Sequence, residues 1–462
     1  MKIFNSYSGK KEDFKPIKEG QVTMYVCGPT VYNDMHLGNV RPQVAFDVLR
    51  RYFIFKGYDV TYVSNFTDVD DKIINKANEE GVDIKTISDR YIKSVERDYT
   101  DLGLYEYPIE HPTCTDHMDD IIDFIQGLID KGFAYEANGS VYFRVRKLKD
   151  YGRLSNRNIE DLEIGARIEE NTEKEDPLDF TLWKEKKEGE PYWDSPWSQG
   201  RPGWHIECST MIRSRFGSTI DIHAGGEDLK FPHHENEIAQ SEALNDAPLA
   251  HYWMHNGMIN IDDVKMSKSL GNFFYAHEFI EKEGAELLRF FILNAQYRKP
   301  LNYSNEAIES VRAMISRLRN AKDRLKGLIE KASEGPENKD LRASVDQIKN
   351  DLRTHMDDDL NTPDAVTDWL SLAKLINTSL NESSSLEDLK YVKSAFDDFV
   401  LIFGVIEDEE TTIDADIDAL IQEREEARKN KDYARADEIR DQLKAEGIVL
   451  KDTKDGVKWQ RL

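Results

Sequence analysis

The chain has 462 residues, of which 39% are hydrophobic, and at about 150 residues per domain we expect about three domains. No apolar run reaches the roughly 18 residues of a membrane-spanning helix, the N-terminus lacks a signal-peptide pattern, and cysteines are few, which together indicate a cytoplasmic protein without a membrane partner. The formal net charge of −26 predicts weak non-specific binding to polyanions, but nucleic acid is not excluded, because phosphate contacts need only a local basic surface.

The first predicted elements form a strand, a helix and a second strand. Residues 22–27 alternate apolar with other side chains and predict a strand. A helix follows, in which we expect Asn39 as the N-cap and Pro42 in the first turn, and residues 60–63 predict the second strand. Such a βαβ unit binds ligands at the carboxyl ends of its strands.

The segment His36-Leu37-Gly38-Asn39 precedes this helix on the expected ligand side of the unit. Free N–H groups at a helix N-terminus attract phosphate, and a glycine such as Gly38 lets a purine or a ribose approach the backbone closely. The alternative is a capping loop with an ordinary histidine, and the segment alone does not decide between the two.

An insertion is predicted at residues 116–195. A helix at 119–132 leads into strands and a loop that contains Trp183, Trp193 and Trp197. The α/β pattern returns from about residue 196, so we expect the insertion to separate two halves of one domain.

Two of the three cysteines lie beside segments with site-like patterns. Cys27 ends the first predicted strand, and Pro232 begins a helix on which His233 and Glu237 are four residues apart on one face. With Cys208, these residues offer two thiolates, an imidazole and a carboxylate, which is a plausible zinc set. No short Cys-x-x-Cys spacing is present, so spacing alone leaves metal binding open.

The segment Lys265-Met266-Ser267-Lys268-Ser269 predicts a polar loop. In a functional role, its two ammonium groups would neutralise a triphosphate while the α-phosphate is attacked and pyrophosphate leaves. The alternative is a solvated surface loop.

The last third of the chain changes character. Residues 304–405 are almost wholly helical in pattern, with breaks at 333–336 and 381–385, and an acidic linker at 407–410 precedes a final unit. That unit predicts two helices, near 417–430 and 433–446, and a strand pair around Val449 and Trp459. Trp459 either stacks an RNA base or belongs to a small core.

Basic residues recur along the first predicted bundle helix and in the C-terminal tail. They offer either a surface for RNA or ordinary solvated faces. The helix carries Arg312, Arg317, Arg319, Lys322, Arg324 and Lys326, and the tail carries Lys451, Lys454, Lys458 and Arg461.

Together, the segments 36–39 and 265–269 resemble the signature pair of class I aminoacyl-tRNA synthetases, and the flanking residues narrow the resemblance to the cysteinyl-tRNA synthetases. The resemblance is strong over residues 20–275 and rests on architecture after 300. One departure is Asn39, where the class pattern has histidine; asparagine can donate a hydrogen bond to phosphate but carries no charge.

The resemblance implies that Cys27, Cys208, His233 and Glu237 hold zinc on the floor of an amino-acid pocket. His234 is the competing imidazole, but the residue four positions on is Ile238, which cannot bind a metal. An apolar pocket separates side chains as small as those of cysteine and serine by only about 10- to 200-fold. Zinc prefers a thiolate to a hydroxyl, so no separate editing domain is expected.

The resemblance also implies roles for residues whose local patterns favour turns or core positions. Asp228 would accept hydrogen bonds from the ribose, Trp204 would pack beside the metal-bound sulfur, and His223 would close the amino-acid pocket, with Thr67 near the amino acid. The expected catalytic residues are His36, Asn39, Lys265 and Lys268, and ATP would also contact Gly38 and Lys268.

The implied fold is α/β: a Rossmann-type parallel-sheet catalytic domain with an insertion, followed by an all-α helical bundle and a small C-terminal α+β unit. The expected boundaries are 1–115 for the first catalytic half, 116–195 for the insertion, 196–250 for the second half with the zinc helix, 251–303 for the signature loop and stem contact, 304–405 for the bundle and 411–462 for an anticodon-binding domain.

The implied activity is that of a monomeric cysteine–tRNA ligase. ATP with Mg²⁺ and L-cysteine would give cysteinyl adenylate, and the acyl group would pass to the 3′ adenosine of tRNA(Cys). One alternative is an aminosugar ligase with the same adenylate chemistry, against which the unit after Glu410 argues. The other is a non-catalytic zinc and nucleotide binding module, against which His36, Lys265 and Lys268 argue.

Overall fold

The computed structural model describes residues 1–158, 173–262, 264–265 and 273–407, and a discontinuous set between 420 and 461 that includes the last two strands. The chain forms two compact units, residues 1–406 and 407–462. None of the described helices is long and apolar enough to cross a membrane.

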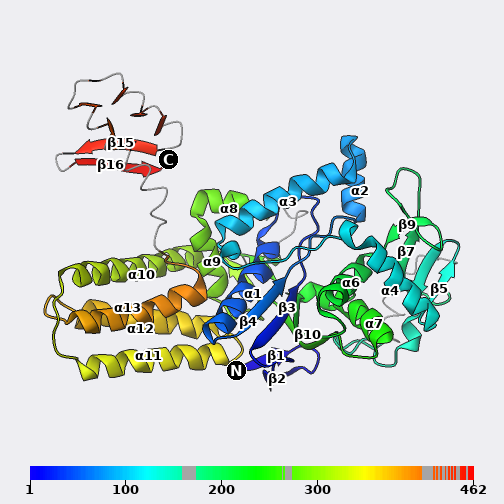
Figure 1. Ribbon diagram of the computed structural model, residues 1–462, viewed down its shortest axis with the longest axis horizontal. Helices are drawn as coiled ribbons and strands as arrows, with labels where there is room; N and C mark the ends of the chain where they lie inside the picture. The colour runs from blue at the N-terminus through cyan, green and yellow to red at the C-terminus, as the bar shows by residue number, and fades with distance from the viewer. Residues whose placement is uncertain are drawn as a thin grey trace. The chain divides into compact units, whose positions relative to one another are not determined.

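A parallel sheet of four strands in the order β11-β10-β3-β4 forms the centre of the first unit (Figure 1). On it, Met24 pairs with Ile222 on one side and with Tyr62 on the other. Because all four strands run the same way, the segments that follow them meet at one edge. The strands are β3 (Gln21–Val26), β4 (Asp59–Val63), β10 (Ile220–Gly226) and β11 (Ala250–Asn256).

Helix α1 (Leu37–Phe55) connects β3 to β4 and confirms the predicted βαβ unit. The prediction that Asn39 is its N-cap was wrong: His36 is the N-cap, and Asn39 is the third helical residue. Asn39 Oδ1 accepts a hydrogen bond from the His36 backbone N–H at 3.2 Å, so the asparagine caps from inside the first turn. Pro42 therefore lies in the second turn instead of the first.

The insertion is confirmed as an antiparallel sheet between the two halves of the parallel sheet. Helix α4 (Met118–Asp130) leads into five strands in the order β5-β6-β7-β9-β8. The helices α6 (Trp204–Phe216) and α7 (His233–Asn245) follow it. The strands are β5 (Ala134–Ala137), β6 (Ser140–Phe143), β7 (Phe180–Glu185), β8 (Trp193–Asp194) and β9 (Gln199–Pro202).

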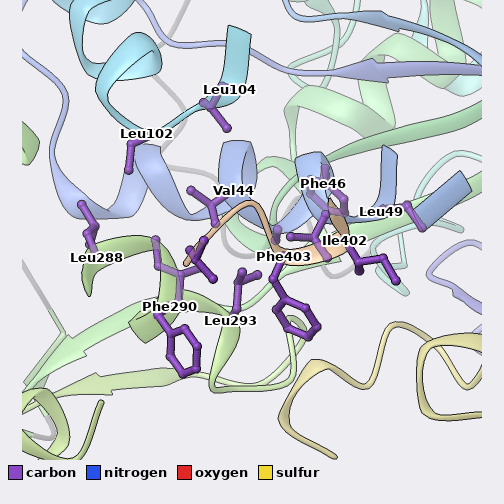
Figure 2. Packing of buried hydrophobic residues seen from close by; sticks show 14 of the residues in the cluster. Val44, Phe46, Leu49, Leu102, Leu104, Leu288, Phe290, Leu293, Ile402 and Phe403 are labelled. Carbon is purple, nitrogen blue, oxygen red and sulfur yellow. The ribbon is translucent and has the colours of Figure 1, made fainter. Parts of the chain in front are cut away.

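The helical bundle is also confirmed, with both predicted breaks. Its apolar end packs against α1 and α9 (Ala285–Leu293), where Phe403 lies among Phe46, Leu49 and Leu293 (Figure 2). The parallel-sheet half and the bundle therefore share one core. The bundle helices are α10 (Asn305–Lys331), α11 (Lys339–Asp357), α12 (Thr362–Ser379) and α13 (Leu386–Phe403).

Several of the basic residues on α10 contact the protein itself. Arg319 forms an ion pair with Glu286 at 2.9 Å, and Lys322 donates to the Ile406 carbonyl at 2.6 Å. These side chains fasten α10 to neighbouring segments, and a role of this helix in binding RNA stays a prediction.

In the second unit, β15 (Ile448–Thr453) and β16 (Gly456–Arg461) form the predicted antiparallel pair. Trp459 pairs with Leu450 in the backbone register. The side chains of these strands lie outside the described residues, so the role of Trp459 stays a prediction.

Candidate active site

A cavity of about 320 Å³ opens at the carboxyl edge of the parallel sheet. The predicted phosphate segment contributes His36, Gly38 and Asn39 to its wall, and Cys27 and Trp204 line it as well. Asp228, in the turn after β10, also lines the cavity. The structure thus brings the nucleotide segment and one member of the predicted metal set to a single cavity.

The start of α1 provides the groups expected for phosphate binding. The free N–H groups of a helix N-terminus carry partial positive charge. The side-chain oxygen of Asn39 is engaged with the backbone of His36, so its amide nitrogen is the group available to a phosphate oxygen. The His36 ring lies against Phe273, with ring centroids 5.2 Å apart.

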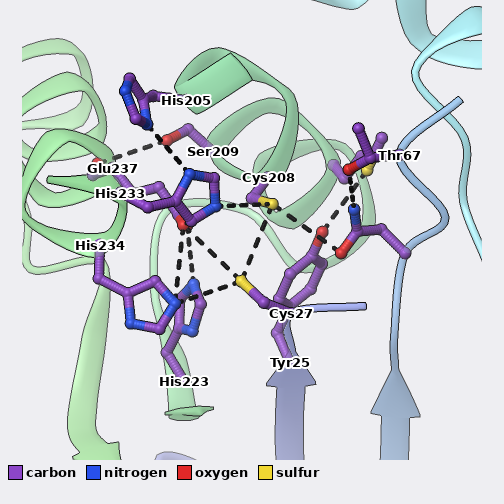
Figure 3. A network of polar contacts seen from close by, with 12 residues as sticks. Tyr25, Cys27, Thr67, His205, Cys208, Ser209, His223, His233, His234 and Glu237 are labelled. Atoms are coloured by element: carbon purple, nitrogen blue, oxygen red, sulfur yellow. Dashed lines mark hydrogen bonds and ion pairs between the residues drawn. The ribbon is translucent and has the colours of Figure 1, made fainter. Parts of the chain in front are cut away.

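Beside this cavity, Cys27, Cys208, His233 and Glu237 form a buried cluster (Figure 3). Cys27 follows β3, Cys208 lies on α6, and His233 and Glu237 lie on successive turns of α7. One ligand atom from each residue lies within 4.8 Å of all the others.

The spacing of these atoms fits a tetrahedral metal ion. With bonds of about 2.3 Å to sulfur and about 2.0 Å to nitrogen or oxygen, neighbouring ligands of zinc are about 3.3 to 3.8 Å apart. The two Sγ atoms are 4.0 Å apart, and Cys208 Sγ lies 3.6 Å from His233 Nε2. Glu237 Oε1 lies 3.8 Å from Cys27 Sγ and 2.9 Å from His233 Nε2. The donor set and the distances are therefore consistent with a metal site.

Charges within the cluster favour the deprotonated form of Cys208 and Glu237, whereas the pKa values of Cys27 and His233 are raised. A hydrogen bond from Cys27 lowers the pKa of the Cys208 thiol to about 6. Burial alone would raise the pKa of Glu237, but His223 and His233 hold it well below its usual value. Burial raises the pKa of Cys27. Metal ligands must lose their protons on binding, and two of these groups are poised to do so.

A second set of donors overlaps the first. His223 and His234, with Cys27 and Glu237, also bring four ligand atoms within 4.8 Å of one another. His223 Nε2 lies 2.7 Å from Glu237 Oε2, and His234 Nδ1 lies 2.8 Å from His255 Nε2. Only the set with Cys208 offers two sulfur ligands.

The other residues predicted to contact the substrate differ in burial and in their position relative to the cluster. Trp204 is 39% exposed and stacks on the His233 ring with centroids 4.3 Å apart. Thr67 is buried, and its Oγ1 accepts a hydrogen bond from Asn65 Nδ2 at 3.2 Å. His223 is fully buried against Trp253 and bonds to Glu237, so it lies behind the cluster and does not line the cavity. The substrate roles of these residues stay predictions.

The second signature falls largely outside the described residues. Lys265 ends β13 (Val264–Lys265), but its side chain is not described, and Lys268 lies outside the described ranges. The strand belongs to a small sheet with β12 (Ile259–Ile261) and β14 (Leu301–Tyr303).

Asn65 is a site residue that was not among those predicted from the sequence. Its Oδ1 accepts a hydrogen bond from the Gly28 N–H at 3.0 Å and lies 3.9 Å from Cys208 Sγ. Asn65 thus connects the end of β4 to the cavity and to the cluster. Its place directly after a strand of the βαβ unit was the signal available in the sequence.

Gly28 is required by this close approach of β3 and β4. A Cβ atom at residue 28 would lie 1.7 Å from the backbone oxygen of Asn65. We expect Gly28→Ala to destabilise the protein by about 1 to 3 kcal/mol and to displace Asn65 and Cys27. Gly327→Ala is the matched control, because residue 327 lies in a helix with open space around it. Thermal unfolding of both variants measures the difference; equal melting temperatures would contradict the steric account.

Sequence comparisons match the whole chain. The family model described as the tRNA synthetases class I (C) catalytic domain matches residues 13–313, a DALR domain matches 352–407, and a cysteinyl-tRNA ligase anticodon binding domain matches 410–459. A cysteine–tRNA ligase of Lachnospira eligens is 53% identical, and one of Clostridioides difficile is 51% identical, each over 100% of both chains.

Solved structures show the same fold. A methionyl-tRNA synthetase of Mycobacterium tuberculosis, in complex with methionyl-adenylate, has a TM-score of 0.62 at 16% identity over 83% of this chain and 89% of its own. A putative arginyl-tRNA synthetase of Campylobacter jejuni has a TM-score of 0.59 at 14% identity over 85% and 94%. The fold and the site define a class I aminoacyl-tRNA synthetase. Within that class, the chain belongs to the cysteinyl-tRNA synthetase family.

Proposed function

We propose that this chain activates L-cysteine with ATP to form cysteinyl adenylate and transfers the cysteinyl group to the 3′ adenosine of tRNA(Cys). The observation that carries the proposal is the shared cavity. It is lined both by the start of α1 and by Cys27 and Trp204, which lie beside the predicted metal cluster. A nucleotide phosphate and a small thiol amino acid can therefore meet in one enclosed place.

On the nucleotide side, the helix N-terminus, His36 and Asn39 bind the phosphates of ATP, which enters with Mg²⁺. Asp228 accepts hydrogen bonds from the ribose hydroxyls. Lys265 and Lys268 supply positive charge as pyrophosphate leaves, an electrostatic contribution that needs no covalent enzyme intermediate.

On the cysteine side, Cys27, Cys208, His233 and Glu237 hold zinc, which when bound supplies a soft Lewis acid that prefers a thiolate to a hydroxyl. Trp204 packs over His233 and covers the substrate side chain on the side that faces the cavity. Thr67 and Asn65 orient the amino acid, and His223 keeps Glu237 in place through its 2.7 Å contact.

The reaction follows from holding the two substrates in line. The cysteine carboxylate attacks the α-phosphate of ATP, the bond to the bridging oxygen breaks, and pyrophosphate departs. Orientation of this kind can contribute about 7 to 11 kcal/mol to lowering a barrier. The terminal ribose hydroxyl of the tRNA then attacks the acyl carbon, and AMP leaves.

The unit after residue 407 supports tRNA as the acceptor, because residues 410–459 match an anticodon binding domain. We further propose a cytoplasmic monomer. An aminosugar ligase with the same adenylate chemistry would have no use for such a unit.

Isotope exchange between pyrophosphate and ATP tests the activation step. We expect exchange that depends on cysteine, with serine and alanine at the same concentration supporting less than about 0.5% of the rate, because an apolar pocket alone discriminates by only about 200-fold. Exchange with no amino-acid dependence, or none at all, would contradict the proposal and favour a non-catalytic binding module.

A further inference from the structure

Arg41 is an unusual residue on α1, between Asn39 and Pro42, which both line the cavity proposed to bind the nucleotide. Its side chain is 1% exposed. The other buried arginines on this helix, Arg50 and Arg51, both form ion pairs with Asp47. Among the residues that the structure describes, Arg41 forms no ion pair, although the charge of Glu227 acts against the effect of burial on its pKa. A buried charge without an ion pair lowers stability unless hydrogen bonds compensate for the loss of hydration.

The guanidinium of Arg41 binds four backbone carbonyls. Nη1 donates to the carbonyls of Gly257 and Met258, each at 2.7 Å. Nη2 donates to the carbonyls of Tyr297, at 3.2 Å, and Lys299. The rigid fork of an arginine can satisfy several acceptors at once, which a lysine ammonium on a flexible stem does with less geometric control.

The first pair of carbonyls belongs to a wall of the nucleotide cavity. Gly257, Met258 and Ile259 all line that cavity, as do Gly38 and Asn39. Arg41 therefore ties the start of α1 to the segment that leaves β11. Both of these segments contribute residues to the lining of the same cavity.

The second pair of carbonyls belongs to the turn before β14. Gly257 N–H donates to the Tyr297 carbonyl at 2.8 Å, and a Cβ atom at residue 257 would lie 2.6 Å from the backbone of Lys299. The two segments thus pack backbone to backbone under the guanidinium. They also lead into the small sheet β13-β12-β14, from which the second signature continues.

We propose that Arg41 is a positioning residue for ATP: its guanidinium clamps the 257–259 wall to α1 and so sets the width of the nucleotide cavity without contacting the nucleotide. The proposal rests on the proposed function only in naming ATP as the nucleotide. Burial lowers the pKa of Arg41 to about 10, so the clamp stays charged at neutral pH.

Two substitutions separate the effect of the guanidinium hydrogen bonds from the effect of the charge. Arg41→Lys keeps the positive charge but loses the planar guanidinium that binds the four carbonyls, and Arg41→Gln loses both. We expect both variants to raise the KM for ATP in pyrophosphate exchange by about 10- to 100-fold, the range for a misplacement of about 1 Å. The KM for cysteine should change less than about twofold, because the predicted metal cluster with Cys27 and Cys208 lies on other segments.

Arg324→Lys is the matched control. Arg324 also donates to backbone carbonyls, those of Ile376 and Leu380, but within the helical bundle. Both KM values of this variant should stay within twofold of the unsubstituted protein. Thermal unfolding of all variants identifies any that fail to fold, and nucleotide binding by titration calorimetry with ATP alone gives a second readout for those that fold.

Three results would overturn the proposal. A normal KM for ATP in Arg41→Lys would mean that charge alone matters, and equal effects on both KM values would mean general destabilisation. A lower kcat at unchanged KM would place Arg41 in the chemical step. If the unsubstituted protein shows no exchange but binds ATP in the calorimeter, the proposed function fails, while weaker ATP binding by Arg41→Lys would still support the clamp.

Discussion

Cys208→Ala is expected to remove bound zinc and to lower cysteine-dependent pyrophosphate exchange by more than about 100-fold, because even residues that only support a metal ligand contribute about 10- to 100-fold. Cys208 Sγ lies 3.6 Å from His233 Nε2 and 4.0 Å from Cys27 Sγ, so its loss opens one corner of the cluster. Metal content by mass spectrometry measures the first effect independently of activity.

Cys114→Ala is the matched control for this prediction. Cys114 is fully buried in the same apolar cluster as Cys208, but it belongs to neither set of metal donors. We expect it to keep one zinc per chain and to retain its exchange activity. Zinc retained in Cys208→Ala and lost in His234→Ala would instead favour the second donor set, with His223 and His234.

The second large effect is expected at Asp47, where α1 meets α9. This carboxylate accepts hydrogen bonds from Arg50, Arg51 and Arg289, and all four side chains are 1% exposed. Arg289 also donates to the Phe403 carbonyl at the end of the bundle. Removing one partner from a buried charge network costs about 3 to 5 kcal/mol. We expect Asp47→Asn to lower the free energy of unfolding by that amount, as measured by denaturant titration.

The pH dependence gives an independent check. The three arginines outweigh the effect of burial and hold the pKa of Asp47 well below its usual value in the folded state. A depressed carboxylate pKa stabilises the protein above its unfolded value of about 3.9, and this stabilisation is lost as the pH falls further. The stability difference between the native protein and Asp47→Asn should therefore be full at pH 7 and shrink below about pH 4.

Asp89→Asn is the control for this network, because Asp89 pairs with Lys85 on the surface of α3 (Ile84–Asp101), where the two side chains are 51% and 78% exposed. Solvent screens such an exposed pair, so it contributes little to stability. Equal losses in the two variants, or a difference that grows in acid, would contradict the account of Asp47.

Local patterns were enough to predict several elements of the fold. The alternation at 22–27, the helix expected after it and the helical pattern after 304 each correspond to an observed element. The start of α1 was misplaced because asparagine is among the strongest N-caps, whereas Asn39 caps from the third helical position.

Contacts between distant residues could not be read from local pattern. Arg41 binds carbonyls more than 200 positions away, and Asp47 meets Arg289 across the fold. Asp47 with Arg50 and Arg51 has the spacing of ion pairs on a helix, but nothing local indicates the third arginine. The metal set was proposed through the family resemblance, since its members come from three separate segments.

Transfer of labelled L-cysteine to total cellular tRNA, with ATP and Mg²⁺, is the measurement that tests the central claim most directly. We predict charging by cysteine, none above background by serine, and loss of charging in Cys208→Ala but not in Cys114→Ala. Cysteine-dependent pyrophosphate exchange without any charging of tRNA, from a source shown to contain active tRNA(Cys), would contradict the claim and favour a ligase that passes the same adenylate to an aminosugar.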